Sequence, residues 1–90
     1  MRNLLAFDLG ASNGRAILGQ FDGEKITMRE LHRFENNYIE MNGVFYWDLP
    51  YLYNQLKQGL LAFKNANVGE LDCIGIDTWG VDYGLLDKNG

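Results

Sequence analysis

Short apolar runs separated by polar turns occupy both ends of the chain, and a longer helical pattern lies between them. Residues 3–9 are mostly apolar, which is typical of a strand buried on both faces, and we expect this strand to be central. Residues 15–21 and 25–34 predict two more strands, because the links at 10–14 and 22–23 are short and rich in turn residues. The first third of the chain is therefore expected to form three consecutive antiparallel strands.

Residues 35–43 have no clean period and are predicted to be a loop, followed by a short extended piece at 44–47. Asp48 is a favourable N-cap, and Pro50 falls in the first turn of the helix that we expect over residues 49–66. The apolar positions that should pack on a sheet step by three or four, at Leu49, Leu52, Leu56, Leu60 and Phe63.

After the helix, the apolar run at 73–76 predicts a strand that ends at Asp77. Because a helix precedes it as a crossover, this strand should run parallel to the first. Another strand is expected at 83–86. Cys73 lies in the apolar run and is predicted to be a core residue; a single cysteine forms no internal disulfide, which suits a reducing compartment.

The expected order β-β-β-α-β with a mixed sheet predicts the α/β class. Ninety residues make one small domain at most, and its margin of stability should be thin. We expect the sheet to be incomplete at its C-terminal end, and an unfinished edge favours self-association of the chain.

Charge and composition exclude two classes of partner. The net charge is −4 and the basic residues form no run, which argues against a nucleic-acid partner. The N-terminus lacks the apolar stretch of a signal peptide or a membrane span, so no membrane partner is predicted and a cytoplasmic location is expected.

The segment from Asp8 to Arg15 carries the most informative chemistry. An aspartate at the end of a buried strand is followed at once by a turn rich in glycine, in which Gly10 and Gly14 would let the backbone approach an anion closely. Ser12 and Asn13 add side-chain donors for phosphate oxygens. Asp8 would be a poor phosphate ligand but a suitable ligand for Mg²⁺ or its waters.

Glycine-rich turns between strands are common, so this segment also fits an ordinary tight turn. Two standard nucleotide motifs are excluded. No Lys-Ser/Thr pair follows Gly14, as a Walker A motif requires, and a strand rather than a helix is expected after the turn, unlike the Rossmann fingerprint. A hairpin-type phosphate loop remains.

The run FDLGASNGR at 7–15 resembles the first phosphate motif of the superfamily of actin, hexokinase and the heat-shock ATPases, and within it the FGGY family of carbohydrate kinases. Three more segments narrow the resemblance to the rhamnulokinase group of that family. These are L-x-R-F at 31–34, N-G-x-x-x-W-D-L at 42–49 and IGIDTWGVDYGLLD at 74–87. The resemblance covers essentially all ninety residues.

The resemblance implies a partial ribonuclease H-like, actin-like ATPase domain, with residues 1–90 as the N-terminal part of the first lobe and the second lobe absent. It implies phosphorylation of L-rhamnulose by ATP with Mg²⁺, and a catalytic aspartate in a later segment, so that no catalytic residue lies in this chain. Residues that would surround the ATP phosphates are Ala11, Ser12, Asn13, Gly14 and Arg15, beside Asp8 and Gly10. Gly80 would contact the sugar, with Thr78, Trp79 and Asp82 as flanking cleft residues.

Other interpretations stay open for single residues. Trp79 could serve ordinary packing, and Asp77 and Asp82 could be solvated or could stabilise a hairpin. Asp48 is explained as a helix cap and Trp47 as a core aromatic. His32 is interpreted as a surface or edge residue rather than a metal ligand.

Two other functions also stay open. One is a non-catalytic nucleotide-binding module of the actin or heat-shock kind. The other is an FGGY kinase that acts on a different ketose or polyol.

Overall fold

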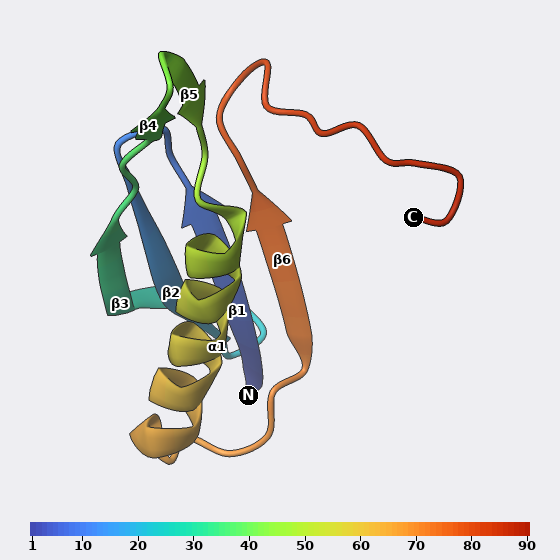
Figure 1. Ribbon diagram of the computed structural model, residues 1–90. Helices are drawn as coiled ribbons and strands as arrows, with labels where there is room; N and C mark the ends of the chain where they lie inside the picture. Colours follow the sequence, from blue (N-terminus) through green and yellow to red (C-terminus); the bar gives the residue numbers. More distant parts are fainter.

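A computed structural model describes all residues of the chain, from Met1 to Gly90. It contains one helix and six strands (Figure 1). The elements in chain order are β1 (Arg2–Leu9), β2 (Asn13–Phe21), β3 (Ile26–Glu35), β4 (Ile39–Met41), β5 (Val44–Tyr46), α1 (Leu49–Ala66) and β6 (Cys73–Asp77).

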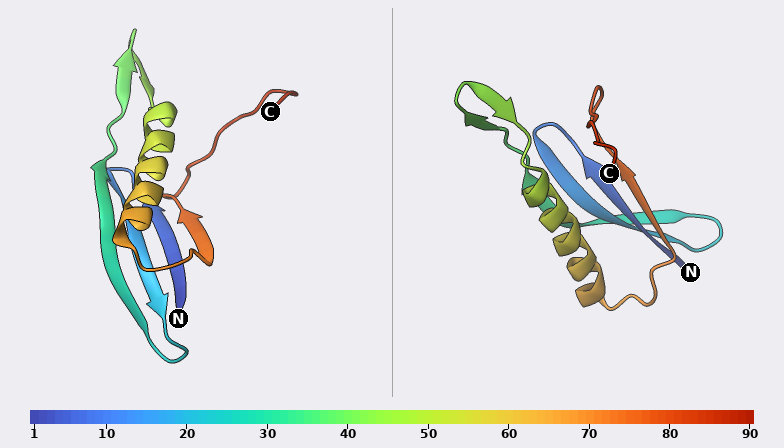
Figure 2. Two further views of the ribbon diagram at one scale, coloured as in Figure 1. Left: turned by 90° about the horizontal axis from the view of Figure 1, so that it is seen from below. Right: turned by 45° about the vertical axis from the view of Figure 1, so that its right-hand side comes forward.

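Four of the strands form one mixed sheet in the order β3-β2-β1-β6. The strands β1, β2 and β3 pair antiparallel, whereas β6 pairs parallel to β1, with Leu4 opposite Cys73 and Asp8 opposite Asp77. Helix α1 lies across one face of this sheet, as both views in Figure 2 show. The predicted α/β class, with a mixed sheet and a helix before the parallel strand, is confirmed.

The hairpin of β4 and β5 is absent from the predicted order, because residues 35–43 were expected to be a loop. The turn between these strands consists of Asn42 and Gly43, both with positive φ (52° and 77°). Two central residues with positive φ match the right-handed twist of a tight hairpin, and Asn-Gly is the pair that adopts this conformation most readily. The loop prediction was therefore wrong over Ile39–Met41.

The core lies between α1 and the two inner strands. Leu5 and Phe7 of β1 and Ala16 and Leu18 of β2 alternate toward the helix and are buried with Phe63 of α1. The helix comes closest to the sheet at a glycine. A Cβ added to Gly59 would lie 2.5 Å from the ring of Phe7 and 3.0 Å from the Cβ of Ala16, so no larger residue fits at this contact.

Helix α1 begins and ends as predicted. The Asp48 carboxylate accepts a hydrogen bond from the Tyr51 N–H at 3.1 Å, which satisfies one of the free donors of the first turn. Asn67 adopts the left-handed conformation at the C-terminal end. Leu52 and Phe63 are buried, but Leu49 is 71% exposed and Leu60 is 40% exposed, so the predicted stripe is only partly buried.

Strand β6 lies at the edge of the sheet and is exposed along its whole length. The prediction that Cys73 is a core residue was wrong: its thiol is free and exposed. Ile74 and Ile76 are 47% and 57% exposed. The physical reason is that α1 contacts β1, β2 and β3 but not β6, so an apolar sequence here lacks a covering layer.

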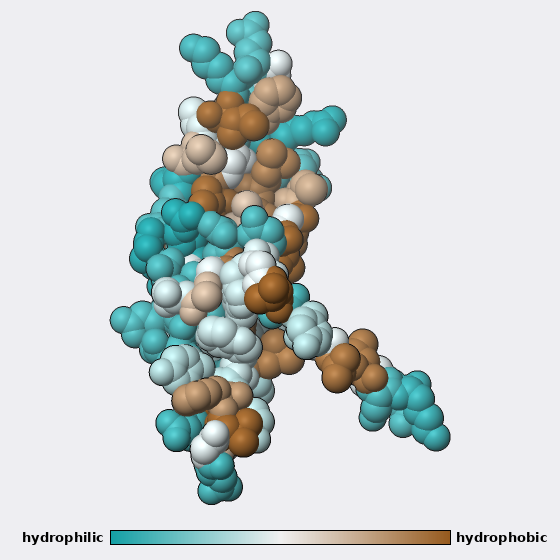
Figure 3. Space-filling model, turned by 90° about the horizontal axis from the view of Figure 1, so that it is seen from above, coloured by the Kyte–Doolittle hydropathy of each residue, from teal (hydrophilic) through white to brown (hydrophobic).

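The segment after β6 forms no regular structure, and the strand predicted at 83–86 does not occur. Tyr83 is 82% exposed and Leu86 is 83% exposed, because this segment has no neighbouring strand to pair with and runs away from the body of the molecule. Figure 3 shows the same projecting arm, and hydrophobic residues also lie open on the surface of the body. The helix of this structure is not both long and apolar enough to cross a membrane.

Candidate functional site

The turn between β1 and β2 is tighter than the sequence predicted. Asn13 and Gly14 already belong to β2, so the connection is reduced to Gly10, Ala11 and Ser12. The Gly10 N–H donates to the Asn13 carbonyl at 2.9 Å and closes the turn. A Cβ on Gly10 would lie 2.8 Å from that same carbonyl oxygen, so the close approach of the two backbones requires glycine. We call Gly10–Ser12 the hairpin turn.

Gly14 has a different reason to be glycine than the one the sequence indicated. It is buried, and a Cβ there would lie 2.2 Å from the ring of Phe34 on β3. Gly14 therefore makes room for an aromatic ring under the hairpin turn, and its own backbone does not turn sharply. Its predicted place beside a phosphate stays a prediction.

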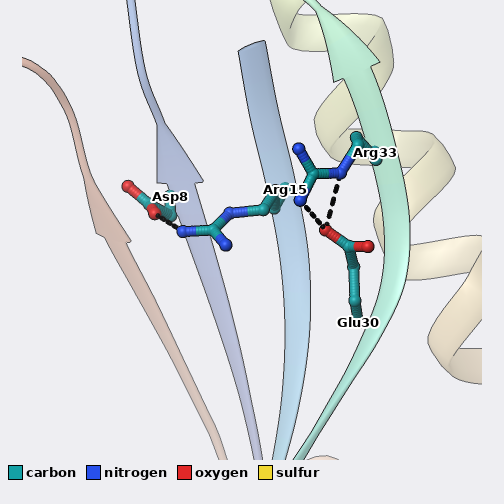
Figure 4. Close-up of polar contacts among 4 residues, drawn as sticks. All are labelled: Asp8, Arg15, Glu30 and Arg33. Atoms are coloured by element: carbon teal, nitrogen blue, oxygen red, sulfur yellow. Dashed lines mark hydrogen bonds and ion pairs between the residues drawn. The ribbon is translucent and has the colours of Figure 1, made fainter.

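Asp8 and Arg15 face each other across the β1–β2 ladder, immediately before and after the hairpin turn. The Arg15 guanidinium donates to the Asp8 carboxylate at 2.6 Å (Figure 4). This hydrogen bond is the main reason that the pKa of Asp8 lies below the ordinary range of an aspartate. A second ion pair joins Arg33 and Glu30 of β3 at 2.8 Å and is drawn in the same figure.

Asp77 is the end of β6 and lies opposite Asp8 in the parallel register. A hydrogen-bonding contact with the Asp8 carboxyl, which favours the protonated form of Asp77, raises the pKa of Asp77, and repulsion between the two negative charges raises it further. A shallow pocket of about 310 Å³ is lined by both aspartates together with Ala6, Phe7, Gly75 and Ile76. The sequence left the role of Asp77 open, and the structure places it beside Asp8.

Two neighbouring carboxylates at the ends of parallel strands are suited to a hydrated Mg²⁺ ion, which keeps several waters and binds one or two carboxylates. Asp8 and Asp77 fit that role. They do not form a closed metal cage, since no group of three or more histidine, cysteine, aspartate or glutamate side chains comes together in the chain. His32 donates to or accepts from Gln55 at 2.6 Å on the edge strand β3, in agreement with its interpretation as an edge residue.

An apolar groove of about 490 Å³ lies between the start of α1 and the segment after β6. Thr78, Trp79 and Asp82 line it, whereas Gly80 does not. The remaining lining comes from the end of β1, from the start of α1 with the residue before its cap, and from the segment after β6, namely Leu9, Trp47, Leu49, Leu52, Tyr53, Leu56, Tyr83 and Gly84. We call this space the tryptophan groove, because Trp47 and Trp79 both line it, with their ring centroids 4.7 Å apart.

Trp47 was predicted to be a core aromatic, and this was wrong. It is 42% exposed and packs against Trp79 at the mouth of the groove rather than inside the core. Trp79 is half-buried against the small cluster of Leu9, Phe34 and Leu52. Because side chains alternate along a strand, Asp8 points to one face of β1 and Leu9 to the other. The Asp8–Asp77 pair and the tryptophan groove therefore lie on opposite faces of the sheet, at the end of β1.

Asn36 was missed by the sequence analysis, because a polar residue in a predicted loop carries no distinguishing signal. It follows β3 directly and is only 4% exposed. With Ala11, Ser12, Asn37 and Tyr38 it lines a polar pocket of about 470 Å³ beside the hairpin turn. The hairpin turn is thus in contact with a residue that the motif does not include.

Three curated proteins are similar to the chain over almost its whole length. A rhamnulokinase of Mannheimia succiniciproducens is 50% identical over 90 residues, which cover 98% of this chain and 18% of the relative. A rhamnulokinase of Halalkalibacterium halodurans is 46% identical over 99% of the chain, and one of Bacteroides thetaiotaomicron is 48% identical over 99%.

The chain spans 18–19% of the length of these relatives. No protein-family model matches it. The resemblance to rhamnulokinases that the motifs indicated is confirmed by these similarities.

Proposed function

We propose that this chain supplies the phosphate-binding hairpin and part of the sugar groove of an ATP-dependent carbohydrate kinase, and that the sugar is L-rhamnulose. The product would be L-rhamnulose 1-phosphate. The observation that carries the proposal is the 46–50% identity to three rhamnulokinases over nearly the entire chain.

The chain would form the N-terminal part of the first lobe of an actin-like ATPase domain. The antiparallel order of β1, β2 and β3, followed by α1 and the parallel strand β6, is compatible with that assignment. Its relatives are about five times longer, so we place turnover in a protein of that length, in which a later aspartate would act as general base. The acidic chain and its free thiol suit a cytoplasmic enzyme.

At the acidic end of the site, this chain would hold the charged part of the nucleotide. The N–H groups of the hairpin turn are donors for phosphate oxygens, and Ser12 and Asn13 add polar side chains. Bound Mg²⁺ would neutralise phosphate charge, and Asp8 would hold it with or without intervening waters. Arg15 would act mainly through Asp8, which its guanidinium keeps ionised and in place.

At the tryptophan groove, the chain would hold the sugar. L-rhamnulose is a deoxy sugar with an apolar methyl end, and indole rings pack well against the C–H faces of sugars. Thr78 and Asp82 supply polar groups at the rim of the groove for sugar hydroxyls. Gly80 lies outside the lining, and its proposed contact with the sugar would require a shift of the segment after β6.

The free edge of β6 gives the chain alone a surface for self-association. Its outward side chains include Ile74 and Ile76, and its unpaired backbone can accept another strand. We propose that the chain by itself associates through this edge. Sedimentation should show an average mass that rises with concentration, and Ile76→Lys should lower that mass toward the monomer value.

The test of the proposed function uses a chimeric enzyme, in which this chain replaces the matching segment of the Mannheimia succiniciproducens relative. ADP release is measured with ATP and a panel of L-rhamnulose, L-fuculose, D-xylulose and glycerol. We expect the highest kcat/KM with L-rhamnulose. A chimera that is folded by circular dichroism but releases no ADP with any sugar would contradict a kinase role, and preference for another member of the panel would contradict the substrate.

A pair of variants in the chimeric enzyme assigns the groove. Trp79→Ala should raise the KM for L-rhamnulose by about tenfold, as the loss of a packed aromatic contact predicts, and should leave the KM for ATP nearly unchanged. Asn65→Ala, on the exposed side of α1, is the matched control and should change neither constant. Equal changes in both KM values for Trp79→Ala would show that the residue supports folding rather than the sugar.

A further inference from the structure

Asn36 binds the hairpin turn at two points. Its backbone N–H donates to the Ser12 carbonyl at 2.9 Å, and its side-chain Nδ2 donates to the Gly10 carbonyl at 2.9 Å. One residue at the end of β3 thus contacts the first and the last residue of the hairpin turn. Its side chain is almost completely buried, at 4% exposure, so these bonds are shielded from competing water.

These two bonds set the direction of the donors in the hairpin turn. A trans peptide group is planar, and its C=O and N–H point in opposite directions. Because the Gly10 carbonyl faces Asn36, the N–H of Ala11 faces away from Asn36. The Ser12 carbonyl likewise directs the N–H of Asn13 away. No cis peptide occurs in the chain, and the N–H groups of Ala11 and Ser12 donate no hydrogen bond within it.

The remaining polar atom of Asn36 has no partner. Nδ2 must face the Gly10 carbonyl, since a carbonyl only accepts, and Oδ1 is then left buried without a donor. An unpaired buried acceptor lowers the stability of a fold. Asn3, the other buried asparagine, uses both Nδ2 and Oδ1 in hydrogen bonds. The side chain of Asn36 is thus less completely paired than that of Asn3.

We propose that Asn36 is a positioning residue for phosphate binding: it holds the carbonyls of Gly10 and Ser12 so that the neighbouring N–H groups point toward the ligand. This inference rests on the proposed function of the hairpin turn and extends it to a residue outside the motif. Asn36 itself does not contact the phosphate in this scheme, because its free Oδ1 is buried and would repel an anion.

The direct test follows backbone amides of the full chain by NMR during titration with Mg–ADP. The amide resonances of Ala11, Ser12 and Asn13 should shift on binding. Asn36→Ala should weaken the apparent Kd by about tenfold, the change that one lost hydrogen bond of the usual net strength produces. Asn36→Asp keeps the size and the backbone bond but presents an acceptor to the Gly10 carbonyl, and it should weaken binding at least as much.

Asn3→Ala is the matched control, because it removes a buried asparagine that also donates to backbone carbonyls, at the opposite end of the sheet. It should lower the melting temperature more than Asn36→Ala and leave the Kd within about twofold of the parent. The proposal is overturned if Asn36→Asp binds like the parent, or if the two alanine variants weaken binding equally.

The chimeric enzyme separates this inference from the proposed function. There Asn36→Ala should raise the KM for ATP by about tenfold while the KM for L-rhamnulose stays within about twofold. An inactive parent chimera would count against the kinase, and the NMR titration would still decide the role of Asn36. An active parent whose ATP KM is insensitive to Asn36→Ala would overturn the inference and leave the kinase standing.

Discussion

The two ends of the four-stranded sheet each contain one buried asparagine, and the two are used differently. At the end where β1 begins, Asn3 donates from Nδ2 to Val68 and Glu70 and accepts from Gln20 on Oδ1. Its backbone exchanges two further hydrogen bonds with Asp72. At the end where β1 finishes, Asn36 leaves Oδ1 unpaired.

The charged groups also differ between the two ends of the sheet. The Asp8 and Asp77 carboxyls meet at the end where Asn36 lies, and only Asp8 has a cation within bonding distance. Neighbouring like charges and an unpaired acceptor both disfavour folding. The polar side chain of Asn3 is therefore fully paired at one end of the sheet, whereas the other end contains an unpaired acceptor and two neighbouring carboxyls. Features that lower stability are expected at functional sites.

The largest expected effect on stability comes from the packing of α1 on the sheet, between the two ends compared above. Gly59→Val would place a branched side chain where a single Cβ already comes within 2.5 Å of Phe7, so α1 would be forced off the sheet. We expect a loss of about 3 kcal/mol in the free energy of unfolding, measured in urea. Gly75→Ala on β6, where a Cβ meets nothing within 4 Å, is the control and should change it by less than about 0.5 kcal/mol.

The next effect separates the two asparagines. Asn3→Ala leaves two carbonyls and the Gln20 amide without their partners and should lower the free energy of unfolding by about 2 kcal/mol. Asn36→Ala should cost less, because it also removes an unpaired acceptor. Chemical unfolding of both variants in one buffer gives the ranking, and the comparison fails if Asn36→Ala proves the more destabilising.

A smaller effect depends on pH and concerns the acidic pair. The folded-state pKa of Asp77 is raised, so its ionised form is disfavoured in the fold, and this penalty is absent well below the ordinary aspartate pKa. Asp77→Asn should therefore stabilise the chain at pH 7, and the gain should shrink as the pH falls through the raised pKa.

Asp8→Asn should do the opposite. The pKa of Asp8 is lowered by Arg15, so its charge stabilises the fold above the ordinary aspartate pKa, and this contribution is lost as the pH falls through the lowered value. Thermal melts of both variants between pH 3 and pH 7 check the two signs. The same sign for both variants at neutral pH would show that the carboxyls do not act as a coupled pair.

The smallest effect lies on the exposed edge. Cys73→Ser should change the free energy of unfolding by less than about 0.5 kcal/mol, because the thiol is already in water. At a concentration at which the folded chain is monomeric, Cys73 should react with a thiol reagent at nearly the rate of a free cysteine. Protection of the thiol until unfolding would mean that β6 is covered in solution.

The sequence predicted correctly those helices and strands whose signals lie in neighbouring residues. The strands at β1, β2 and β3, the Asp48 cap and the parallel direction of β6 all followed from periodicity, turn residues and crossover geometry. The β4–β5 hairpin was missed although its signal, Asn42-Gly43 between apolar residues, is present in the sequence.

Burial was harder to predict, because it depends on which strands the helix covers. An apolar run predicts a strand but does not say whether another layer lies over it, so Cys73 was placed in the core. The strand expected at 83–86 needed a pairing partner that the chain does not supply there. Both features depend on tertiary structure, which a short stretch of sequence does not determine.

Some residues of the candidate site could likewise be predicted from the sequence, and others could not. The hairpin turn and the Asp8–Arg15 pair are close in sequence and could be found from a motif. The sequence showed an aspartate near the end of β1 (Asp8) and one at the end of β6 (Asp77), and parallel pairing brings the two together. Asn36 lies 26 positions from Gly10, and nothing local distinguishes it from other loop asparagines. The roles of all these residues in binding stay predictions.

The contact between the two tilted indole rings has a practical consequence. The chain has two tryptophans, Trp47 and Trp79, and both face the same groove with their rings 4.7 Å apart. Intrinsic fluorescence excited at the red edge of absorption therefore reports on this groove alone, and the coupled rings should give a signal in near-ultraviolet circular dichroism that vanishes when they separate. The two tryptophans thus serve as an intrinsic spectroscopic probe of the space between α1 and the segment after β6.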